Sequence, residues 1–539
     1  MSMPKPVRGS TPNPDHIMLS LLEKAASQRA VTWRTSLDAP TGFLDFWEDI
    51  PDSGHVRLEA ENRLFESDID QSVMHSAHMP DLKPNTRYRY TCGNQTHRAG
   101  PFLFATGEAD PKKFKFICIS DIQKGSPHDC PDYGTLHDFL QSLLQAHPDC
   151  AFLLTAGDNT DCGQHEVQWN GLFAGLAGIA ESMPFMMTLG NHDNRGFADY
   201  AKGVGRYYAE PAAYFGTQFC GAYPQNGPDG WTTENYTFRY GDVMIGVVGI
   251  NEPEIVNQWM IDSCKATDAA WKIGVYHFPI CYSGVNLENY DAYPAMREGF
   301  ESFDLIFAGH EHSFARSFPL RNESLFAQPS KGTIHYNIGN GNYNPPGTRS
   351  LAKVWHAAQY TMEENIAAAV IVEVDGMTLT LTSVLSDGRV MDKCVINKTT
   401  DCVLPHALPP MFNRTRMMYK GWDLGLAQAD TPCEQKDSVW CVPMGVLIQS
   451  IGGAVTKTKG QIRLEIYGAW GVFTEGSNIA QTSAGDLALP LPVYRGQRGQ
   501  LYIPAMACEI FRMRFGVAAH NNFLSFEQPT EDRPITEQP

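Results

Sequence analysis

The stretch CAFLLTAGDNTD, residues 150–161, joins a buried strand to a polar turn. Its mostly apolar first half predicts a strand that is covered on both faces, as in a parallel sheet. Gly157 opens the turn, and Asp158 and Asp161 follow it three residues apart. A single carboxylate after a strand is most often a turn residue. Two carboxylates beside Gly and Asn indicate a cation site, so the other residues of that site need to be found.

The same arrangement recurs where other apolar runs of the middle region end. The runs KFKFICIS, MPFMMTLG, WKIGVY and FDLIFAG each lead into carboxylate, amide or imidazole groups. The carboxyl ends of strands in an open α/β sheet form one edge, where ligands bind. Nitrogen and oxygen donors without cysteine favour Mn, Fe, Zn or Co. The full set is Asp121, Gln123, Asp158, Asn191, His192, His277, His310 and His312.

These side chains are too many for one ion, which favours two divalent cations. One carboxylate can bridge two cations that lie about 3.5–4 Å apart, the separation found in two-metal hydrolases. Such a pair binds a phosphoryl oxygen and lowers the pKa of a water molecule between the ions. Each motif alone is explained as well by a turn or a loop. Their occurrence together, in this order and context, favours a functional site.

The composition is that of a globular protein, with 43% hydrophobic residues in 539 and a formal net charge of −18 at pH 7. The acidic balance argues against binding to long nucleic acid or to anionic membranes. No segment reaches the roughly 18 apolar residues of a membrane span. Without an apolar run at the N-terminus we expect no signal peptide and a cytoplasmic protein, in which the thirteen cysteines are mostly reduced. Cys433 and Cys441 either pair or are two core thiols.

The chain divides into three regions and a tail. Residues 14–107 alternate between strands and turns and predict a β-sandwich. Residues 112–400 alternate apolar runs with helical segments, which predicts an α/β domain. Residues 401–524 follow a proline-rich joint and predict a β-rich domain, whereas the polar, proline-rich tail 525–539 predicts disorder. The strand-like runs of the third region are 444–451, 460–468, 499–507 and 510–519.

These motifs resemble the calcineurin-like metallophosphoesterase superfamily and, within it, the purple acid phosphatase branch. In the middle region the resemblance is carried by QWNGLF, GNHD, VYHFPICYS, FAGHEHSFARS and IGNGNYNPPG. VTWRT and LKPNTRYRYTCG are similar to the fibronectin type III-like domain of that branch. The resemblance implies a multidomain protein: an N-terminal β-sandwich, then a four-layer αββα metallophosphoesterase domain. The region after residue 401 has no counterpart in it.

The resemblance also implies roles for the strand-end residues. Asp121, Asp158 and His312 correspond to ligands of one metal. Asp158, as the bridge, corresponds with Asn191, His277 and His310 to the ligands of the second. His192 corresponds to the histidine that faces the substrate and the leaving-group oxygen. Asp193 either orients His192 or is a loop carboxylate.

Several positions depart from the purple branch. Asp161 replaces the tyrosine that binds ferric iron and gives the colour, so we expect a colourless protein in which Asp161 binds or neighbours a divalent ion. Gln123, where other members have Gly or His, is expected to bind a metal or to lie beside one. Asn286 and Leu287 replace a pair of substrate-binding histidines, so the pocket differs. The arginines that either contact substrate or are structural are Arg195, Arg206 and Arg316.

We therefore expect a two-metal phosphoric-ester hydrolase in which a metal-bridging hydroxide attacks the phosphorus of a small phosphodiester or phosphomonoester. The missing histidine pair favours a diester slightly. An acid-phosphatase-like phosphomonoesterase is the alternative. An alternative of another class is a binding or assembly protein with a relict metal site. The C-terminal domain could cover the site, bind a sugar or mediate a homo-oligomer.

Overall fold

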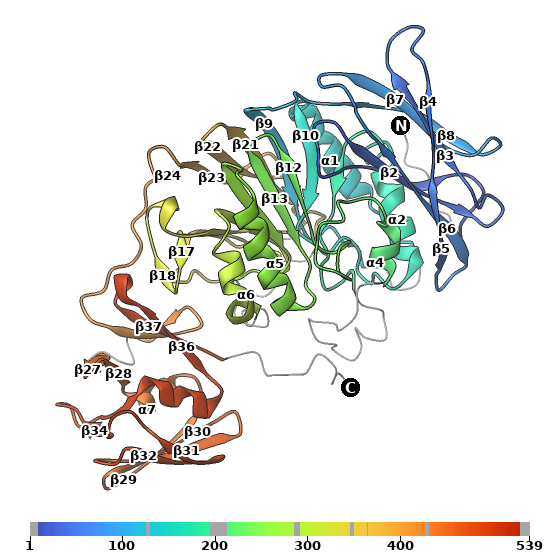
Figure 1. Ribbon diagram of the computed structural model, residues 1–539. Helices are drawn as coiled ribbons and strands as arrows, with labels where there is room; N and C mark the ends of the chain where they lie inside the picture. The colour runs from blue at the N-terminus through green and yellow to red at the C-terminus, as the bar shows by residue number, and fades with distance from the viewer. Residues whose placement is uncertain are drawn as a thin grey trace.

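The computed structural model describes residues 9–125, 130–194, 213–284, 292–344, 350–363, 365–425 and 431–528. Figure 1 shows the N-terminal strands at one end, the two large sheets in the middle and the C-terminal domain at the other end. Among the described residues, no helix has the length and apolar character needed to cross a bilayer.

The N-terminal region consists of two four-stranded sheets. They share one apolar core around Val31, Trp33, Leu44 and Tyr90, and residues 9–107 contain no helix, as the sequence predicts. The first sheet has the order β1 (Asp15–Leu21), β2 (Arg29–Ser36), β6 (Gln71–Met79), β5 (Glu61–Glu66), and the second the order β4 (Val56–Glu59), β3 (Phe43–Glu48), β7 (Arg87–Gly93), β8 (Arg98–Ala105).

The middle region contains a first sheet of seven strands, which carries three of the five predicted strand ends. Three of its strands run parallel, and the other four are antiparallel to their neighbours. Its order is β11 (Phe185–Met186), β10 (Cys150–Thr155), β9 (Lys113–Ile119), β21 (Ala368–Asp375), β22 (Thr378–Leu385), β23 (Val390–Asn397), β24 (Cys402–Leu404).

A second sheet of seven strands packs against the first, since the Phe152 and Phe238 rings meet at 5.5 Å between centroids and one apolar cluster includes residues of both sheets. Four of its strands, β13, β14, β15 and β19, are parallel neighbours. Its order is β12 (Tyr236–Tyr240), β13 (Val243–Val248), β14 (Trp271–Tyr276), β15 (Leu305–Ala308), β19 (Ile334–Ile338), β16 (Phe314–Ser317), β20 (His356–Tyr360).

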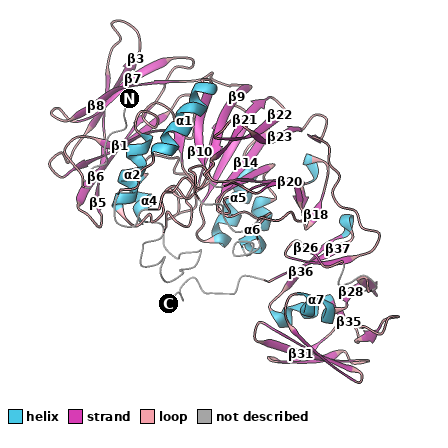
Figure 2. Cartoon of the chain, turned by 180° about the vertical axis from the view of Figure 1, so that it is seen from behind, coloured by secondary structure: helices cyan, strands magenta, loops and turns pink. Residues whose placement is uncertain are grey.

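Helices flank the two sheets on opposite sides. In Figure 1, α5 (Pro253–Ala266) and α6 (Ala292–Phe300) lie in front of the second sheet. Figure 2, seen from behind, shows α1 (Gly134–Ala146) and α2 (Glu166–Leu176) in front of the first sheet. The apolar residues at helical spacing in 135–147 form the buried face of α1. They are Leu136, Phe139, Leu140 and Leu143.

The C-terminal region has its own core, which includes Leu447, Phe473 and Ile503. Three small sheets surround this core. Their orders are β26 (Trp422–Asp423), β25 (Arg416–Tyr419), β37 (Phe523–Glu527), β36 (Arg514–Ala518); then β27 (Glu434–Lys436), β28 (Val439–Val442), β35 (Leu501–Pro504), β34 (Tyr494–Arg495); and β29 (Ala454–Thr458), β30 (Gln461–Ile466), β31 (Ala469–Thr474), β32 (Ile479–Thr482), β33 (Gly485–Ala488).

Two predictions for the C-terminal region are wrong. Residues 444–451 do not form a strand, because Met444–Ser450 is the helix α7, which buries Met444, Leu447 and Ile448 on one face; a short apolar run fits either structure. The predicted tail begins too early, since β37 extends through Glu527 and pairs with two strands. Residues 529–539 lie outside the described part of the chain.

Of the two states that the sequence leaves open for Cys433 and Cys441, the structure shows two free, buried thiols.

A histidine buried in the second sheet makes a prediction about acid stability. Burial lowers the pKa of His335 from an ordinary 6.5 to about 3. The folded state therefore binds no proton there between pH 6.5 and 4, while the unfolded state does, so stability is present above pH 6.5 and is lost as the pH falls. At pH 5.5 this group lowers the free energy of unfolding by on the order of 1 kcal/mol relative to neutral pH.

Urea unfolding at pH 7.5 and 5.5 checks this prediction. The drop in unfolding free energy between the two pH values should be on the order of 1 kcal/mol smaller in His335→Gln than in the wild type. An equal drop in both proteins would contradict the burial argument.

Candidate metal centre

The ends of five strands bring the predicted ligands to one edge of the two sheets. Strands β9, β10 and β11 of the first sheet precede Asp121, Asp158 and Asn191. Strands β14 and β15 of the second sheet precede His277 and His310. Because the strands within each group run parallel, their carboxyl ends meet, as the sequence pattern predicts.

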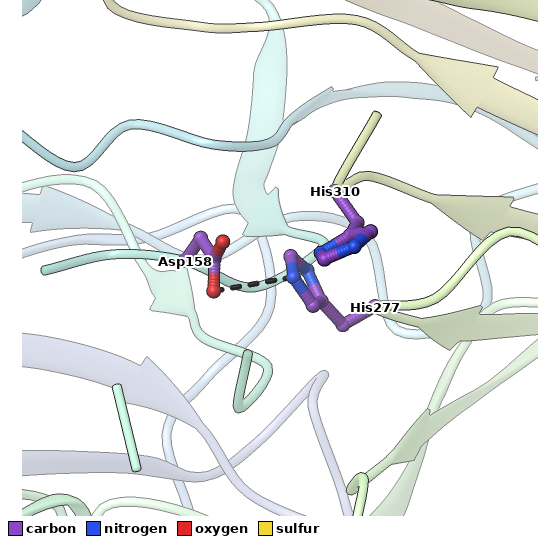
Figure 3. Close-up of side chains that lie close together, drawn as sticks. All are labelled: Asp158, His277 and His310. Carbon is purple, nitrogen blue, oxygen red and sulfur yellow. Dashed lines mark ion pairs between the residues drawn. The ribbon is translucent and has the colours of Figure 1, made fainter. Parts of the chain in front are cut away.

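The residues predicted to bind the second metal lie in direct contact. The ligand atoms of Asp158, His277 and His310 all fall within 4.8 Å of one another (Figure 3). His277 Nε2 lies 3.1 Å from Asp158 Oδ1 and 3.0 Å from Asn191 Oδ1. His310 Nδ1 lies 3.0 Å from the same Asn191 oxygen. All four side chains can therefore converge on one cation.

The residues predicted for the first metal lie next to this cluster. His312 Nε2 is 3.5 Å from Asp121 Oδ1, and the backbone N–H of His310 donates to both oxygens of Asp121 at 2.9 Å. Gln123 Nε2 is 3.4 Å from Asp158 Oδ2. Within the described part of the chain, the buried Gln123 Oε1 accepts no hydrogen bond. Buried polar oxygens are almost always bound to a partner, and a cation beside Asp158 would be such a partner.

The backbone of the ligand loops is strained. Asp121, Asp158, His310 and His312 all have a positive φ, between 49° and 71°. Residues other than glycine rarely adopt this conformation, and such strain clusters at functional sites. Four of the predicted ligands share it, so the loops hold a conformation that only the surrounding structure stabilises.

Glycines precede the ligands because the loops approach each other closely. A Cβ on Gly157 would lie 2.5 Å from His277 Nδ1, and one on Gly190 would lie 2.2 Å from the Asp158 backbone nitrogen. At Gly309 a Cβ would lie 1.8 Å from Ser120 Oγ. The repeated pairs Gly-Asp, Gly-Asn and Gly-His are thus required by packing.

Burial and charge act in opposite directions on the ligands. Burial alone would raise the pKa of Asp158, but His192, His277 and His310 hold it well below its usual range. Burial would lower the pKa of His277, and Asp158 raises it to about 9. An ionised carboxylate among imidazoles is suited to a cation, and a metal binds imidazole only in competition with the proton.

His192 is oriented by Asp161. His192 Nδ1 lies 2.9 Å from Asp161 Oδ1 and 3.0 Å from the Asp161 carbonyl oxygen. Both partners are acceptors, so Nδ1 carries the proton. Nε2 lies 3.7 Å from Asp158 Oδ2, on the side of the ligand cluster. His192 is thus held in one tautomer and one direction.

Of the two roles that the sequence leaves open for Asp193, its contacts match that of a loop carboxylate. Its carboxylate is fully buried and accepts the backbone N–H groups of Asn159, Thr160 and Gly190 at 2.8–2.9 Å. These bonds join the loop after β10 to the loop after β11. Asp193 therefore fixes the two loops, and the contact to the His192 ring is made by Asp161.

Two positioning asparagines were missed by sequence reasoning. Asn344 Nδ2 donates to the Asp121 carbonyl at 2.9 Å, and Asn342 Nδ2 donates to the Ile122 carbonyl at 2.8 Å. The repeated Asn in IGNGNYN is the sequence signal that could have indicated this positioning role.

Arg316, a candidate for substrate binding, forms a buried ion pair with Asp392 at 2.7 Å and is structural. The remaining substrate candidates Arg195, Arg206, Asn286 and Leu287 lie outside the described residues.

Two family models match the chain. Residues 114–314 match the calcineurin-like phosphoesterase family, and residues 14–106 match the purple acid phosphatase N-terminal domain. The chain thus combines a calcineurin-like phosphoesterase domain with the N-terminal domain of the purple acid phosphatase branch. The match at 14–106 lies within the predicted N-terminal region 14–107, and the match at 114–314 lies within the predicted middle region 112–400.

Known members of this branch are similar at low sequence identity. Purple acid phosphatase 21 of Arabidopsis thaliana is 25% identical over 292 residues, which cover 50% of this chain and 58% of that protein. The Arabidopsis protein named probable inactive purple acid phosphatase 27 is 22% identical over 329 residues, 53% of this chain and 52% of that one. The chain spans somewhat more than half the length of these relatives.

Solved structures show the same fold. The purple acid phosphatase PPD1 from yellow lupin seeds superposes with a TM-score of 0.57 at 17% identity, over 71% of this chain and 74% of that one. The structure of PhoD gives a TM-score of 0.50 at 11% identity, over 75% of this chain and 94% of that one. At these identities the comparison concerns the fold alone.

Proposed function

We propose that the chain is a two-metal phosphoric-ester hydrolase that acts on a small phosphodiester or phosphomonoester. The observation that carries the proposal is the cluster of Asp158, His277 and His310, with Gln123 beside Asp158 and the Asp121–His312 pair next to the cluster. One set is Asp121, Gln123, Asp158 and His312. The other is Asp158, Asn191, His277 and His310.

The donor set fits divalent cations. Carboxylate, amide and imidazole ligands suit Mn, Fe, Zn or Co. When bound, two such cations would neutralise phosphoryl oxygens and lower the pKa of water between them. Asp161 stands where the purple branch has an iron-binding tyrosine, and its carboxylate contacts His192. Without that phenolate we expect a colourless protein.

His192 is the group of the chain that we propose to act on the substrate. Its Nδ1 proton is held by Asp161, and its side chain is 20% exposed, so Nε2 can reach a bound ester. Protonated at Nε2, it would donate a proton to the leaving-group oxygen. Asp161 would stabilise the imidazolium, and Asp193 would hold the loops in register through its three backbone bonds.

The residues expected to bind the substrate favour a diester over a monoester. A monoester carries a second negative charge, which extra cationic or imidazole groups would have to bind. The histidine pair that the purple branch uses is replaced by Asn286 and Leu287. In the part of the chain that the structure describes, His192 is then the imidazole outside the predicted ligand set that lies beside Asp158.

Comparing p-nitrophenyl phosphate with bis(p-nitrophenyl) phosphate tests the proposal. The protein loaded with Mn²⁺ should hydrolyse the bis ester at least as efficiently as the monoester. A preference of more than about tenfold for the monoester, or 1.4 kcal/mol, would select the phosphomonoesterase alternative. Hydrolysis of neither ester by fully loaded protein would favour the binding or assembly protein.

A further inference from the structure

The loop that follows the ligand His277 is held at every backbone carbonyl from residue 281 to 284. The carbonyls of Cys281 and Tyr282 accept bonds from His356 Nε2 at 3.1 Å and Trp355 Nε1 at 3.2 Å. That of Ser283 accepts the Leu351 N–H at 2.8 Å, and that of Gly284 accepts Lys353 Nζ at 2.6 Å. One segment, residues 351–356, therefore supplies all four donors.

The other side of the same loop is bonded to the metal-ligand loop. Glu311 lies between the ligands His310 and His312 in the sequence. Its carboxylate accepts the backbone N–H groups of Ser283 at 2.7 Å and Gly284 at 2.8 Å. A displacement of residues 281–284 would thus pull on the residue between two predicted ligands.

Three consecutive residues of the C-terminal domain, Lys420–Trp422, contact this framework, and we call them the brace. Tyr282 Oη donates to the Lys420 carbonyl at 2.5 Å. A Cβ on Gly421 would lie 2.4 Å from the Trp355 indole ring. Lys353 Nζ lies 4.1 Å from the centre of the Tyr282 ring and 5.0 Å from that of Trp422.

The residues that make these contacts are buried. Tyr282 is 1% exposed, and Lys353, Trp355 and Lys420 are 6–7% exposed. Burial lowers the pKa of Lys353 to about 8, and the Gly284 carbonyl and two aromatic rings compensate its charge. A charge in such surroundings is stable only while its partners stay in place.

A second set of contacts anchors the same domain. The Leu325 N–H donates to Asn521 Oδ1 at 2.6 Å, and Ser525 Oγ donates to Glu323 Oε2 at 3.2 Å. Leu325 belongs to the short hairpin β17 (Leu320–Arg321) and β18 (Ser324–Leu325). With two anchored points, the domain holds the brace in a fixed position.

We propose that the C-terminal domain is a positioning element of the phosphoesterase site. Its brace fixes residues 281–284 and, through Glu311, the loop that carries His310 and His312. The expected change in turnover rests on the proposed function. The expected change in the dynamics of residues 281–284 does not depend on it. The domain acts on substrate turnover although none of the brace residues is a metal ligand.

Two matched glycine variants test the proposal. Gly421 and Gly460 have nearly the same backbone φ, +78° and +76°, but a Cβ on Gly460 meets nothing within 4 Å. Alanine therefore adds the same backbone strain at both positions and disturbs the Trp355 contact only in Gly421→Ala. We expect Gly421→Ala to lower kcat/KM by about tenfold or more and to speed amide exchange in 281–284. Gly460→Ala should do neither.

Further variants keep the test decisive if Gly421→Ala unfolds the C-terminal domain, which faster exchange in α7 and β30 would reveal. Tyr282→Phe removes only the bond to Lys420 and should speed exchange in 281–284 and lower kcat/KM. Lys353→Met should do the same, and Lys353→Arg should restore part of the loss. Unchanged exchange and kinetics in Tyr282→Phe and Lys353→Met, or equal effects of the two glycine variants, would overturn the proposal. A wild type without phosphoesterase activity would refute the proposed function. The exchange data would then still show whether the brace fixes residues 281–284.

Discussion

Asp158→Asn should lower kcat/KM for phosphoester hydrolysis by at least about a thousandfold, equivalent to about 4 kcal/mol of transition-state stabilisation. Asp158 is 1% exposed and contacts residues of both ligand sets, Gln123 and His277. A neutral amide in its place removes the charge that two cations would share. Metal analysis should therefore show at most one ion per chain, in place of two.

Asp45→Asn serves as the control for Asp158→Asn. Asp45 is a buried carboxylate of the N-terminal sheets, paired with Arg57 at 2.7 Å. Its loss should leave both metal content and turnover unchanged. Full metal occupancy and full turnover in Asp158→Asn would refute the assignment of Asp158 as the shared ligand.

His192→Ala should lower kcat by about 10²–10⁴-fold while both metals stay bound. The imidazole contacts Asp161 at 2.9 Å, and its Nε2 stays 3.7 Å from the nearest Asp158 oxygen, so it is a proton donor rather than a ligand in this account. The loss should be larger for phenyl esters than for p-nitrophenyl esters, because a poorer leaving group needs the proton more.

Asp161→Ala tests the pairing with His192. It removes the acceptor that fixes the imidazole tautomer and should also lower kcat. The double variant should be no slower than His192→Ala alone, since two residues that act as a unit are not additive. Additive losses, or loss of a metal in His192→Ala, would contradict the proposed roles.

The clustering of the candidate ligands at one sheet edge could be predicted from the sequence because it depends on simple periodicity. Strands such as 113–119 and 150–155 are short apolar runs, and the polar residue after each run falls at the same sheet edge. The pattern needs only the parallel order of strands that α/β domains adopt. For this reason Asp121, Asp158 and His277 are found where the sequence indicates.

The contacts between loops could not be predicted in the same way. Asp193 is next to His192 in the sequence and Asp161 lies in the loop after another strand, and only the geometry of the two loops decides which carboxylate meets the ring. Residues 444–451 fit a strand or a helix equally well, because a mostly apolar run of eight residues carries no clear period. The Trp355–Gly421 contact joins residues 66 positions apart in two domains, and nothing local in the sequence encodes it.

The central claim, that two cations held at Asp158 hydrolyse a phosphoester, is tested most directly by titrating Mn²⁺ into metal-free protein while following hydrolysis of bis(p-nitrophenyl) phosphate. We predict that the rate rises from near zero and reaches its plateau at two ions per chain. A plateau at one ion per chain, or no hydrolysis at any metal loading, would contradict the account.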